Sequence, residues 1–373
     1  MTNKILVVGQ TPPPYHGQSI MIEALLKNPL KSVKFYHIRM HFSKSISDIG
    51  KFRLMKVYRL LIIILKIYFY RIAFNIKVLY YPVSGPNKVP VYRDIVILLT
   101  TRWLFLKTIF HFHAAGISHL YPQLSRFTRF IFQCAFYKPF AAIRLTELTP
   151  EDAKFLEAKH EYLIPYGIED PLASDNSSKT VVKDTDDILR ILFVGILHES
   201  KGVMVLLDAC CQLLKMGVAF RIELMGEFKS PEFQARVYKR IIELQLEPYV
   251  TFLGVLTGTD KDDAFKRANC LCFPTFYELE SFGVVLLEAM AFGLSIVTTN
   301  WRSIPTIIDN GKTGYLVEIH RPDLVAKKLA FLGSNKIIRK QIGTAARKRF
   351  LERYTLKIYL MRMNEMFIDV LRN

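Results

Sequence analysis

Two glutamates in an otherwise apolar segment are the residues best suited to chemistry. The segment ELESFGVVLLEAMAFG, residues 278–293, follows the apolar run CLCFP. Glu280 stands just before a helix that we expect to begin near Ser281 or Phe282. Glu288 lies within that helix, among valine, leucine, alanine and methionine. Charged residues are rarely buried without a partner, so we expect these carboxylates to accept hydrogen bonds from the hydroxyl groups of a ligand.

The start of the same helix is expected to bind an anion. Ser281 is the predicted cap of the helix. The amide groups of Gly283 and Val284 would then point at a ligand, where the helix dipole favours negative charge. A carboxylate beside a bound anion is repelled by it unless other interactions compensate. Hydrogen bonds from ligand hydroxyl groups would do so, which again favours recognition of hydroxyl groups by Glu280.

A second anion site is predicted at GILHESKG, residues 195–202, directly after the strand-like run ILFV. A turn flanked by Gly195 and Gly202, followed by a helix from Val203, would place free amide groups at a helix N-terminus. Lys201 would add a positive charge. The segment is neither a Walker loop nor the dinucleotide fingerprint, because it lacks both glycine patterns. An ordinary strand–helix turn is the alternative interpretation.

Further candidates lie nearer the N-terminus. In TIFHFHAAG, residues 108–116, His111 and His113 alternate on a strand and so face one side. His113 falls at the carboxyl end, where ligands of parallel sheets bind. A metal site has no evident third ligand, and either histidine has a structural alternative. Gly17, in the loop TPPPYHGQS, permits close approach to a ligand or belongs to an ordinary loop.

The segment TELTPEDAKFL, residues 146–156, is interpreted as a plain helix start. Thr149 would cap the helix, Pro150 would occupy its first turn, and Asp152 would suit the helix dipole.

Short apolar runs alternate with helical periodicity, which favours parallel sheets. We expect an α/β fold of two Rossmann-like domains that face each other across a cleft. The first domain is residues 1–171, the linker 172–187 and the second domain 188–354, and a helix at 355–373 packs back on the first domain. Ligands are expected at strand carboxyl ends and between domains. The predicted strands are residues 4–10, 34–38, 78–82, 107–112, 141–145, 162–164, 190–194, 221–225, 250–253, 270–273 and 295–298.

The excess of positive charge is confined to the first part of the chain. Residues 1–146 contain 21 Lys and Arg against 3 Asp and Glu, a net charge of +18, whereas the remainder holds 30 of each sign. Such a one-sided field attracts phosphates, nucleic acid or acidic lipid headgroups. No nucleic-acid-binding module is recognisable, so nucleic acid is not an expected partner.

One basic segment also carries bulky apolar residues. VYRLLIIILKIYFYRIA, residues 57–73, has a longest uncharged stretch of six residues, Leu60 to Leu65. A membrane span needs about 20 apolar residues, so this segment is not one. It is either a helix that sets Arg59, Lys66 and Arg71 against an anionic membrane surface or a buried helix with a few solvated cations. The lack of acidic residues favours the membrane.

The five cysteines are odd in number and form no CxxC pair. This usage is typical of apolar filling in a reducing compartment. Met1 leads directly into a strand, without a secretory signal. We therefore expect a cytoplasmic protein, peripheral at the inner face of the cell membrane.

The chain resembles the family 4 glycosyltransferases, which are retaining enzymes of GT-B architecture. The resemblance runs nearly end to end and is most specific over residues 273–317. The family's E-x7-E pattern falls on Glu280 and Glu288. Its glycine–lysine turn falls on residues 195–202, its first glycine loop on residues 16–18 and its histidine on His113.

The resemblance implies transfer of a sugar from a nucleotide-diphosphate donor to a polysaccharide or lipid-linked saccharide, with retention of configuration. UDP-sugars come before GDP-sugars as the expected donor. The departing phosphate oxygen would take the acceptor's proton, so neither a protein nucleophile nor a metal or other cofactor is expected.

The resemblance also implies roles for single residues. Glu288 would hold the ribose hydroxyls, Glu280 the donor sugar, and His113 the donor sugar or the acceptor. Lys201 would neutralise the diphosphate. The backbone contacts to the donor would come from Gly17, Gly195, Phe282, Gly283 and Val284.

Four positions depart from the family pattern. The arginine of the phosphate turn is Ile196, and Arg302 is the proposed replacement for that charge. The other three departures are Tyr166, Asn269 and Thr306, which stand where the family usually has asparagine, aspartate and glutamate. Two other functions are compatible with the chain: a membrane-associated partner subunit with a degenerate site, and a nucleotide-sugar 2-epimerase.

Overall fold

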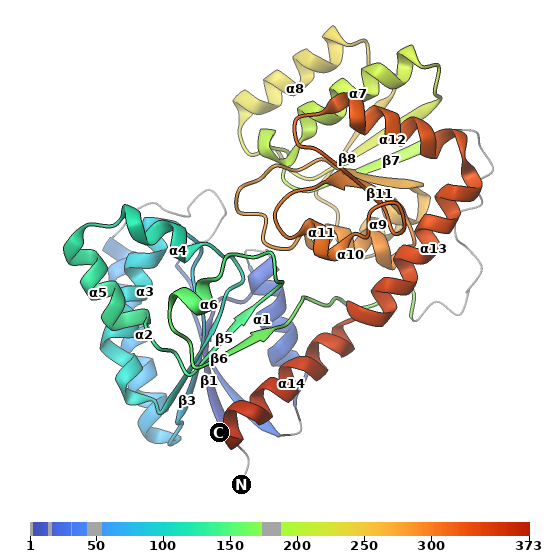
Figure 1. Ribbon diagram of the computed structural model, residues 1–373. Coiled ribbons are helices and arrows are strands. Elements are labelled where there is room, and N and C mark those ends of the chain that lie inside the picture. Colours follow the sequence, from blue (N-terminus) through green and yellow to red (C-terminus); the bar gives the residue numbers. More distant parts are fainter. Residues whose placement is uncertain (1–2, 14–16, 31, 43–53, 174–187) are drawn as a thin grey trace. The chain divides into compact units, whose positions relative to one another are not determined.

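The protein folds as two units, each built around a parallel sheet (Figure 1). The computed structural model describes residues 3–13, 17–30, 32–42, 54–173 and 188–373. Unit 1 comprises residues 1–166 and 357–373, and unit 2 comprises residues 167–356. Most of the expected linker, residues 174–187, lies outside the described residues.

The sheet of unit 1 has six parallel strands in the order β2-β1-β3-β4-β5-β6. Neighbouring strands pair in register, for example Asn3 with Val33 and Val78 with Lys107. The central strand β3 is buried along its whole length, as a strand covered on both faces must be. The strands are β1 (Asn3–Gly9), β2 (Val33–Arg39), β3 (Val78–Pro82), β4 (Lys107–His111), β5 (Ala141–Arg144) and β6 (His160–Leu163).

The C-terminal helix α14 (Leu356–Arg372) belongs almost entirely to unit 1. The ring of Phe367 packs 5.4 Å from Phe35 and 5.9 Å from Tyr80, and Ser32 donates a hydrogen bond to Asn364 at 2.8 Å. The other α-helices of unit 1 are α1 (Gly17–Lys27), α2 (Leu54–Ala73), α3 (Lys88–Thr101), α4 (Ile117–Leu120), α5 (Arg126–Phe136) and α6 (Asp152–Phe155).

Unit 2 repeats the same plan with the strand order β12-β11-β10-β7-β8-β9, all parallel. Its strands are β7 (Leu189–Val194), β8 (Phe220–Met225), β9 (Val250–Gly254), β10 (Cys270–Phe273), β11 (Ser295–Thr299) and β12 (Tyr315–Val317). Its α-helices are α7 (Val203–Lys215), α8 (Pro231–Glu243), α9 (Gly258–Arg267), α10 (Val284–Ala291), α11 (Ile304–Ile307), α12 (Pro322–Ser334) and α13 (Lys336–Arg353).

The predicted strands are confirmed to within two residues at either end, and β12 is a strand that the sequence did not predict. That strand is only three residues long, too short for a periodic signal. No helix in the described ranges has the length and apolar character needed to cross a membrane.

Candidate functional site

The two motifs of unit 2 follow neighbouring strands at the point where the strand order reverses. β7 lies between β8 and β10, and Cys270 of β10 pairs with Ile191 of β7. The segment 195–202 follows β7, and the segment 274–283 follows β10. In open parallel sheets, ligands bind beside the carboxyl ends of the strands at such a switch point.

The backbones of the two segments are in close contact. The amide of Phe276 donates to the carbonyl of Ser200 at 2.8 Å. Gly202 has φ +84°, and a β-carbon there would lie 2.1 Å from the carbonyl oxygen of Pro274. Only glycine fits this approach, because both the backbone angle and the space exclude a side chain. Helix α7 then begins at Val203, as predicted.

Lys201 and Glu280 form an ion pair at the same edge of the sheet. The Nζ atom of Lys201 lies 2.5 Å from Oε2 of Glu280, and the two side chains are only 17% and 10% exposed. The Thr275 hydroxyl donates to the same carboxylate oxygen at 3.3 Å. A positive charge and a hydrogen-bond acceptor are thus held side by side, which suits a ligand that carries both phosphate and hydroxyl groups.

An aromatic ring covers this ion pair. Lys201 Nζ lies 4.5 Å from the ring centroid of Tyr277. Burial, and next the charge of Glu280, raises the pKa of Tyr277 above its usual value, so that the phenol stays neutral. The carbonyl of Tyr277 accepts a hydrogen bond of 2.9 Å from the indole of Trp301. The sequence did not single out Tyr277 or Trp301, because aromatic residues in loops carry no spacing signal.

Arg302 follows Trp301 and is exposed. Its guanidinium carbon lies 5.2 Å from the Trp301 ring, and its backbone has φ +52°. The indole of Trp301 therefore links Arg302 to the segment that contains Glu280: it contacts the guanidinium and donates a hydrogen bond to Tyr277. Its predicted role as the substitute for Ile196 stays a prediction.

Glu288 lies in the second turn of α10 and is paired with a residue that the sequence did not nominate. The Nζ atom of Lys261, on α9, lies 2.6 Å from Oε1 of Glu288. Both side chains are partly exposed. The pairing explains how a carboxylate is tolerated on the apolar helix, since the lysine supplies the missing opposite charge. The sequence of α9 is polar throughout, so nothing in its pattern distinguishes Lys261 as the partner of Glu288.

The predicted start of α10 is wrong by two to three residues, and so is the predicted cap. The helix begins at Val284, after the cap position Gly283, which has φ +74° and no side chain. The Ser281 hydroxyl instead donates to the carbonyl of Leu279 at 3.3 Å. Phe282 is buried, with its ring 6.2 Å from that of Tyr354. The left-handed turn at Gly283 ends the loop, and a serine two residues earlier cannot reach the helix amides.

His113 is held in unit 1 by Tyr166, one of the residues that depart from the family pattern. Nδ1 of His113 and Oη of Tyr166 lie 2.6 Å apart. The ring of His113 stacks on that of His111 at 3.8 Å, which confirms that the two histidines face the same side. Both histidines are buried.

The second histidine belongs to a buried group of tyrosines. Nδ1 of His111 lies 2.5 Å from Oη of Tyr80. Burial lowers the pKa of His111 to about 3 and raises those of Tyr80 and Tyr359. These side chains are therefore neutral at physiological pH. Within the described residues, no three His, Cys, Asp or Glu side chains come close enough to hold a metal ion.

Gly17 is the first residue of α1 and follows β1, which lies between β2 and β3 where the order of unit 1 reverses. His16 and the preceding two residues lie outside the described residues. Gly17 therefore occupies in unit 1 the kind of place that the segment 195–202 occupies in unit 2.

Asp152 has a role that the sequence analysis did not foresee. Helix α6 is a single turn from Asp152 to Phe155 with Glu151 at its cap position, so the predicted Thr149 cap and the predicted place of Pro150 in the first turn are both wrong. The buried carboxylate of Asp152 instead accepts from the amides of Gly116 at 2.6 Å and Ser118 at 2.9 Å. It thereby anchors the loop that follows His113. The two partners lie more than thirty residues before Asp152, so local sequence patterns do not reveal this contact.

Part of the chain matches a known protein family. The family described as "Glycosyl transferases group 1" matches residues 175–349, the range that contains Lys201, Glu280 and Glu288. WcaL of Salmonella typhimurium, named as a colanic acid biosynthesis glycosyltransferase, is 31% identical over 146 residues, which are 38% of this chain and 35% of WcaL. The phosphatidyl-myo-inositol mannosyltransferase of Mycobacterium tuberculosis is 29% identical over 168 residues, 43% of either protein. The matches thus span less than half the length of these relatives.

Solved structures resemble the chain over nearly its whole length. Sucrose-phosphate synthase from Thermosynechococcus elongatus has a TM-score of 0.74 at 15% identity, with 99% of both chains covered. Anabaena HepE, in a structure with UDP-glucose, has a TM-score of 0.72 at 15% identity and covers 98% of this chain and 99% of its own. At this identity the likeness shows the fold alone: the chain has the two Rossmann-like domains of the GT-B glycosyltransferase fold.

Proposed function

We propose that this protein transfers a sugar from a nucleotide-diphosphate donor to a polysaccharide or lipid-linked saccharide, with retention of configuration. The observation that carries the proposal is the ion pair of Lys201 and Glu280 at the switch point between β7 and β10. It lies inside the segment that matches the glycosyltransferase family. The names of the partial relatives, which refer to colanic acid and to phosphatidyl-myo-inositol, support the class of acceptor.

In the proposed reaction, the bond between the anomeric carbon and the β-phosphate oxygen breaks, and the nucleoside diphosphate leaves. The acceptor hydroxyl forms the new bond on the face that the phosphate leaves. Its proton passes to the departing phosphate oxygen, so atoms and charge balance without a protein nucleophile or a metal. The enzyme's task is then to stabilise the charge that builds on the diphosphate.

Six positions of unit 2 are proposed to bind that diphosphate. Lys201 supplies a cation, and the amides of Gly283 and Val284 point from the start of α10. Arg302 supplies a second cation in place of the one lost at Ile196. Gly195 and Phe282 contribute backbone contacts.

The hydroxyl groups of the donor are assigned to carboxylates. Glu280 would accept hydrogen bonds from the sugar, and Glu288 would accept them from the ribose. Each has a lysine beside it, Lys201 at 2.5 Å from Glu280 and Lys261 at 2.6 Å from Glu288. His113 would contact the donor sugar or the acceptor, oriented by Tyr166.

UDP is proposed as the nucleotide of the donor ahead of GDP. HepE, which shares the fold, was solved with UDP-glucose. The protein is proposed to work in the cytoplasm, peripheral at the inner face of the cell membrane, where a lipid-linked acceptor would be found. Ile196 favours one competing function, a membrane-associated partner subunit with a degenerate site. A nucleotide-sugar 2-epimerase is the other, which would convert the donor without an acceptor.

The first experiment measures the melting temperature with UDP-, GDP-, ADP- and CMP-sugars. A ligand that binds only the folded state raises the melting temperature. We expect one nucleotide class to do so in the wild type and not in Glu288→Ala. Glu243→Ala is the matched control, because Glu243 also pairs with basic side chains, Lys239 and Arg240, but lies on helix α8.

Two other outcomes would redirect the assignment. No shift with any donor, in folded protein, contradicts the transferase and supports the degenerate subunit. A shift followed by epimerised donor in the absence of acceptor supports the epimerase.

A further inference from the structure

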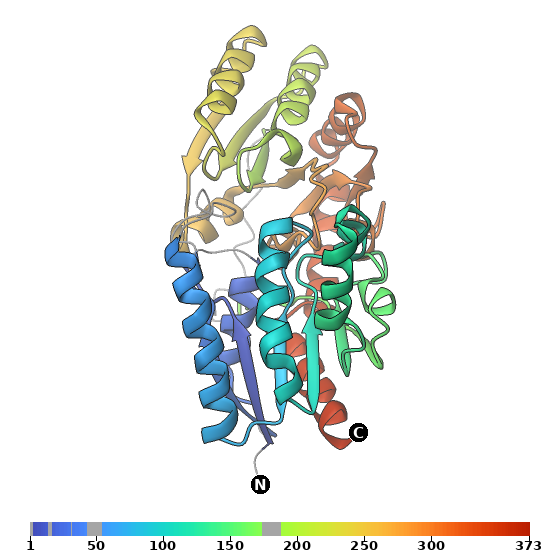
Figure 2. The same cartoon turned by 90° about the vertical axis from the view of Figure 1, so that its left-hand side faces the viewer.

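Exposed apolar side chains are concentrated on one face of unit 1. In Figure 2, the helices α2, α3 and α5 (blue, cyan and green) lie side by side over the sheet of that unit. More than half of the large apolar side chains that are exposed among the described residues lie between Met55 and Phe130. We call the outer surface of these three helices, with the turn at residues 102–106, the α2–α3–α5 face. Its exposed apolar residues are Met55, Val57, Tyr58, Leu61, Leu65, Phe69, Ile72, Val89, Tyr92, Val96, Leu99, Trp103, Leu106, Phe127 and Phe130.

The spacing of these residues follows the helix period. On α2 the exposed apolar residues from Tyr58 to Ile72 recur every three or four positions, while Ile63 and Ile67 on the opposite side are buried in the core. On α3 the exposed positions are 89, 92, 96 and 99, while Val91 and Leu98 are buried. Each helix is thus apolar on both sides, and only the inner side has a partner within the described structure. Apolar patches of this extent on soluble proteins mark surfaces that bind something.

The charge of this region has one sign. Residues 54–138 contain twelve Lys and Arg and one acidic residue, Asp94. Asp94 is buried, paired with Arg93 at 2.8 Å and accepting a hydrogen bond from Tyr81 at 2.8 Å. The exposed cations, among them Lys66 on α2 and Arg126 on α5, therefore have no exposed carboxylate within this stretch to balance them. A surface that is both apolar and basic is complementary to an anionic lipid bilayer.

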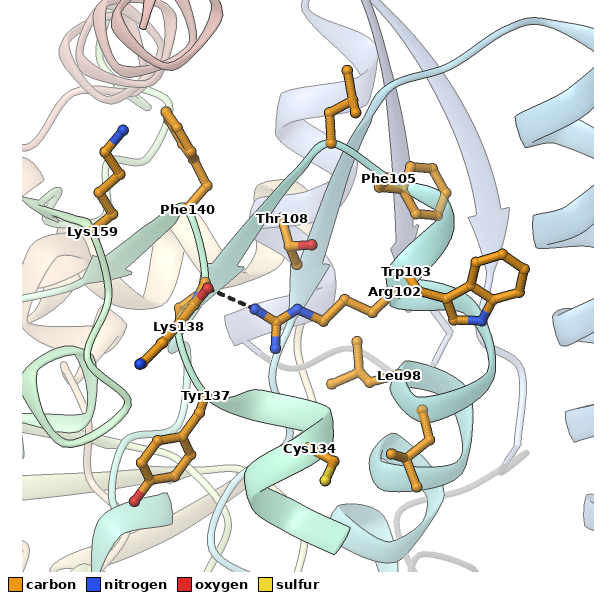
Figure 3. Close-up of a pocket in the computed structure, with 13 residues that line it drawn as sticks. Leu98, Arg102, Trp103, Phe105, Thr108, Cys134, Tyr137, Lys138, Phe140 and Lys159 are labelled. Atoms are coloured by element: carbon orange, nitrogen blue, oxygen red, sulfur yellow. Dashed lines mark hydrogen bonds between the residues drawn. The ribbon is translucent and has the colours of Figure 1, made fainter.

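A pocket of about 570 Å³ opens between the ends of α3 and α5 (Figure 3). Trp103 and Leu106 line it and are 70% and 73% exposed. Arg102, Lys138 and Lys159 also line it, and none of the lining residues is acidic, but the carboxylate of Glu157 lies beside the pocket, 3.6 Å from Nζ of Lys138. Arg102 donates to the carbonyl of Lys138 at 2.8 Å, whereas the Lys138 side chain is exposed. Apolar walls with cations nearby suit a lipid whose headgroup carries a phosphate.

We propose that the α2–α3–α5 face docks on an anionic bilayer, with α2 lying in the plane of the interface and Trp103 and Leu106 entering the acyl boundary. The pocket between α3 and α5 then takes the phosphate headgroup of one lipid. A second copy of the chain is a poorer occupant, because two such faces would bring together two surfaces with an excess of positive charge. The inference deepens the membrane association proposed above by naming the surface, and it rests on that proposal.

The first test is flotation with phosphatidylcholine vesicles, with and without phosphatidylglycerol. We expect binding only to the anionic vesicles, weakened by salt as surface charges are screened over a Debye length of about 10 Å at 0.1 M. Leu65→Ser/Phe69→Ser and Trp103→Ser/Leu106→Ser should each weaken binding at least about tenfold, because each removes two large apolar side chains from the interface. Ile242→Ser/Ile337→Ser is the matched control, since both residues are equally exposed but belong to unit 2.

The second test reads the position of Trp103 directly. Trp301 is the other tryptophan of the chain, so Trp301→Phe leaves Trp103 as the single reporter. Its emission should shift to the blue with anionic vesicles and be quenched by brominated acyl chains. Lys66→Glu, on the exposed side of α2, should weaken binding without removing apolar area.

Several outcomes would overturn the inference: an unmoved emission, equal loss of binding in the unit 2 control, or loss of self-association rather than vesicle binding in the variants. Donor binding is measured without vesicles. Failure of docking with intact donor binding would therefore refute this surface and leave the transferase standing.

Discussion

The ammonium group of Lys201 lies 2.5 Å from the carboxylate of Glu280, although 79 residues separate them in the chain. The pair joins the loop after β7 to the loop after β10. It is nearly buried, and Thr275 and Tyr277 complete its surroundings. One contact thus unites the two segments that were assigned to phosphate and to sugar hydroxyls, and it makes their roles interdependent.

Removing one member of this pair should harm both stability and turnover. Lys201→Met should lower the free energy of unfolding by about 2–4 kcal/mol, because it leaves a nearly buried carboxylate without its counter-charge. Lys201→Met/Glu280→Gln should recover part of that loss. The measurement is a double-mutant cycle by chemical denaturation.

The exposed pair of Lys348 and Glu352 is the control, and its cycle should give less than about 1 kcal/mol. In turnover, each single variant should lose at least about a hundredfold in kcat/KM, as expected for charge stabilisation in the transition state. A coupling energy no larger than that of the control pair would contradict a role for the ion pair.

Gly202 should not tolerate a side chain. Gly202→Ala should reduce the free energy of unfolding by about 3 kcal/mol or more, because its β-carbon would meet Pro274 and its φ is positive. Gly217→Ala is the matched control, since Gly217 has φ +69° but open space around it. This substitution should reduce the free energy of unfolding by about 1 kcal/mol. Equal losses in denaturation would show that the approach of the two loops is not close.

Two buried phenols of unit 1 should respond oppositely to deletion of the hydroxyl group. Tyr166→Phe removes the hydrogen bond to His113 and should lower the free energy of unfolding by about 1 kcal/mol. Tyr359→Phe should be neutral or stabilising, because its buried hydroxyl has no hydrogen-bond partner among the described residues.

If His113 contacts the reacting sugar, Tyr166→Phe should also lower kcat more than it raises the donor KM, because the histidine loses its fixed orientation. Steady-state kinetics of the two variants decide this. Similar kcat values for Tyr166→Phe and Tyr359→Phe would assign Tyr166 to stability alone.

His111 should make unit 1 less stable in acid. Its folded pKa of about 3 lies below the unfolded value of about 6.5, so the unfolded chain binds the extra proton between these limits. This contribution is absent above pH 6.5, and between pH 6.5 and 5 it should lower the free energy of unfolding by about 2 kcal/mol. Denaturation followed by Trp103 in a Trp301→Phe background reports on unit 1.

His111→Gln should remove this part of the pH dependence, so its stability deficit relative to the parent should narrow as the pH falls. His119→Gln, at an exposed histidine, should leave the dependence as it was. Parallel curves for the parent and His111→Gln would show that His111 takes up its proton in the folded state.

The sequence was sufficient to predict the α/β class, almost every strand and the segments that carry the candidate site. These features are local: strands appear as short apolar runs, and the motifs stand directly after them, so a window of a few residues contains the signal. The three-residue strand β12 is too short for such a signal, and the Ser281 cap failed because the turn at Gly283 sets the helix start.

Only the tertiary structure decided which side chains meet. Lys201 pairs with Glu280, Lys261 with Glu288, His113 with Tyr166, and Asp152 caps a helix that precedes it by more than thirty residues. Likewise, the sequence marked residues 57–73 as a helix both basic and apolar, but the joint face that α2 forms with α3 and α5 depends on their packing side by side on one sheet. Contacts of this kind depend on strand order and on the direction of each helix. The spacing of residues along one segment determines neither of them.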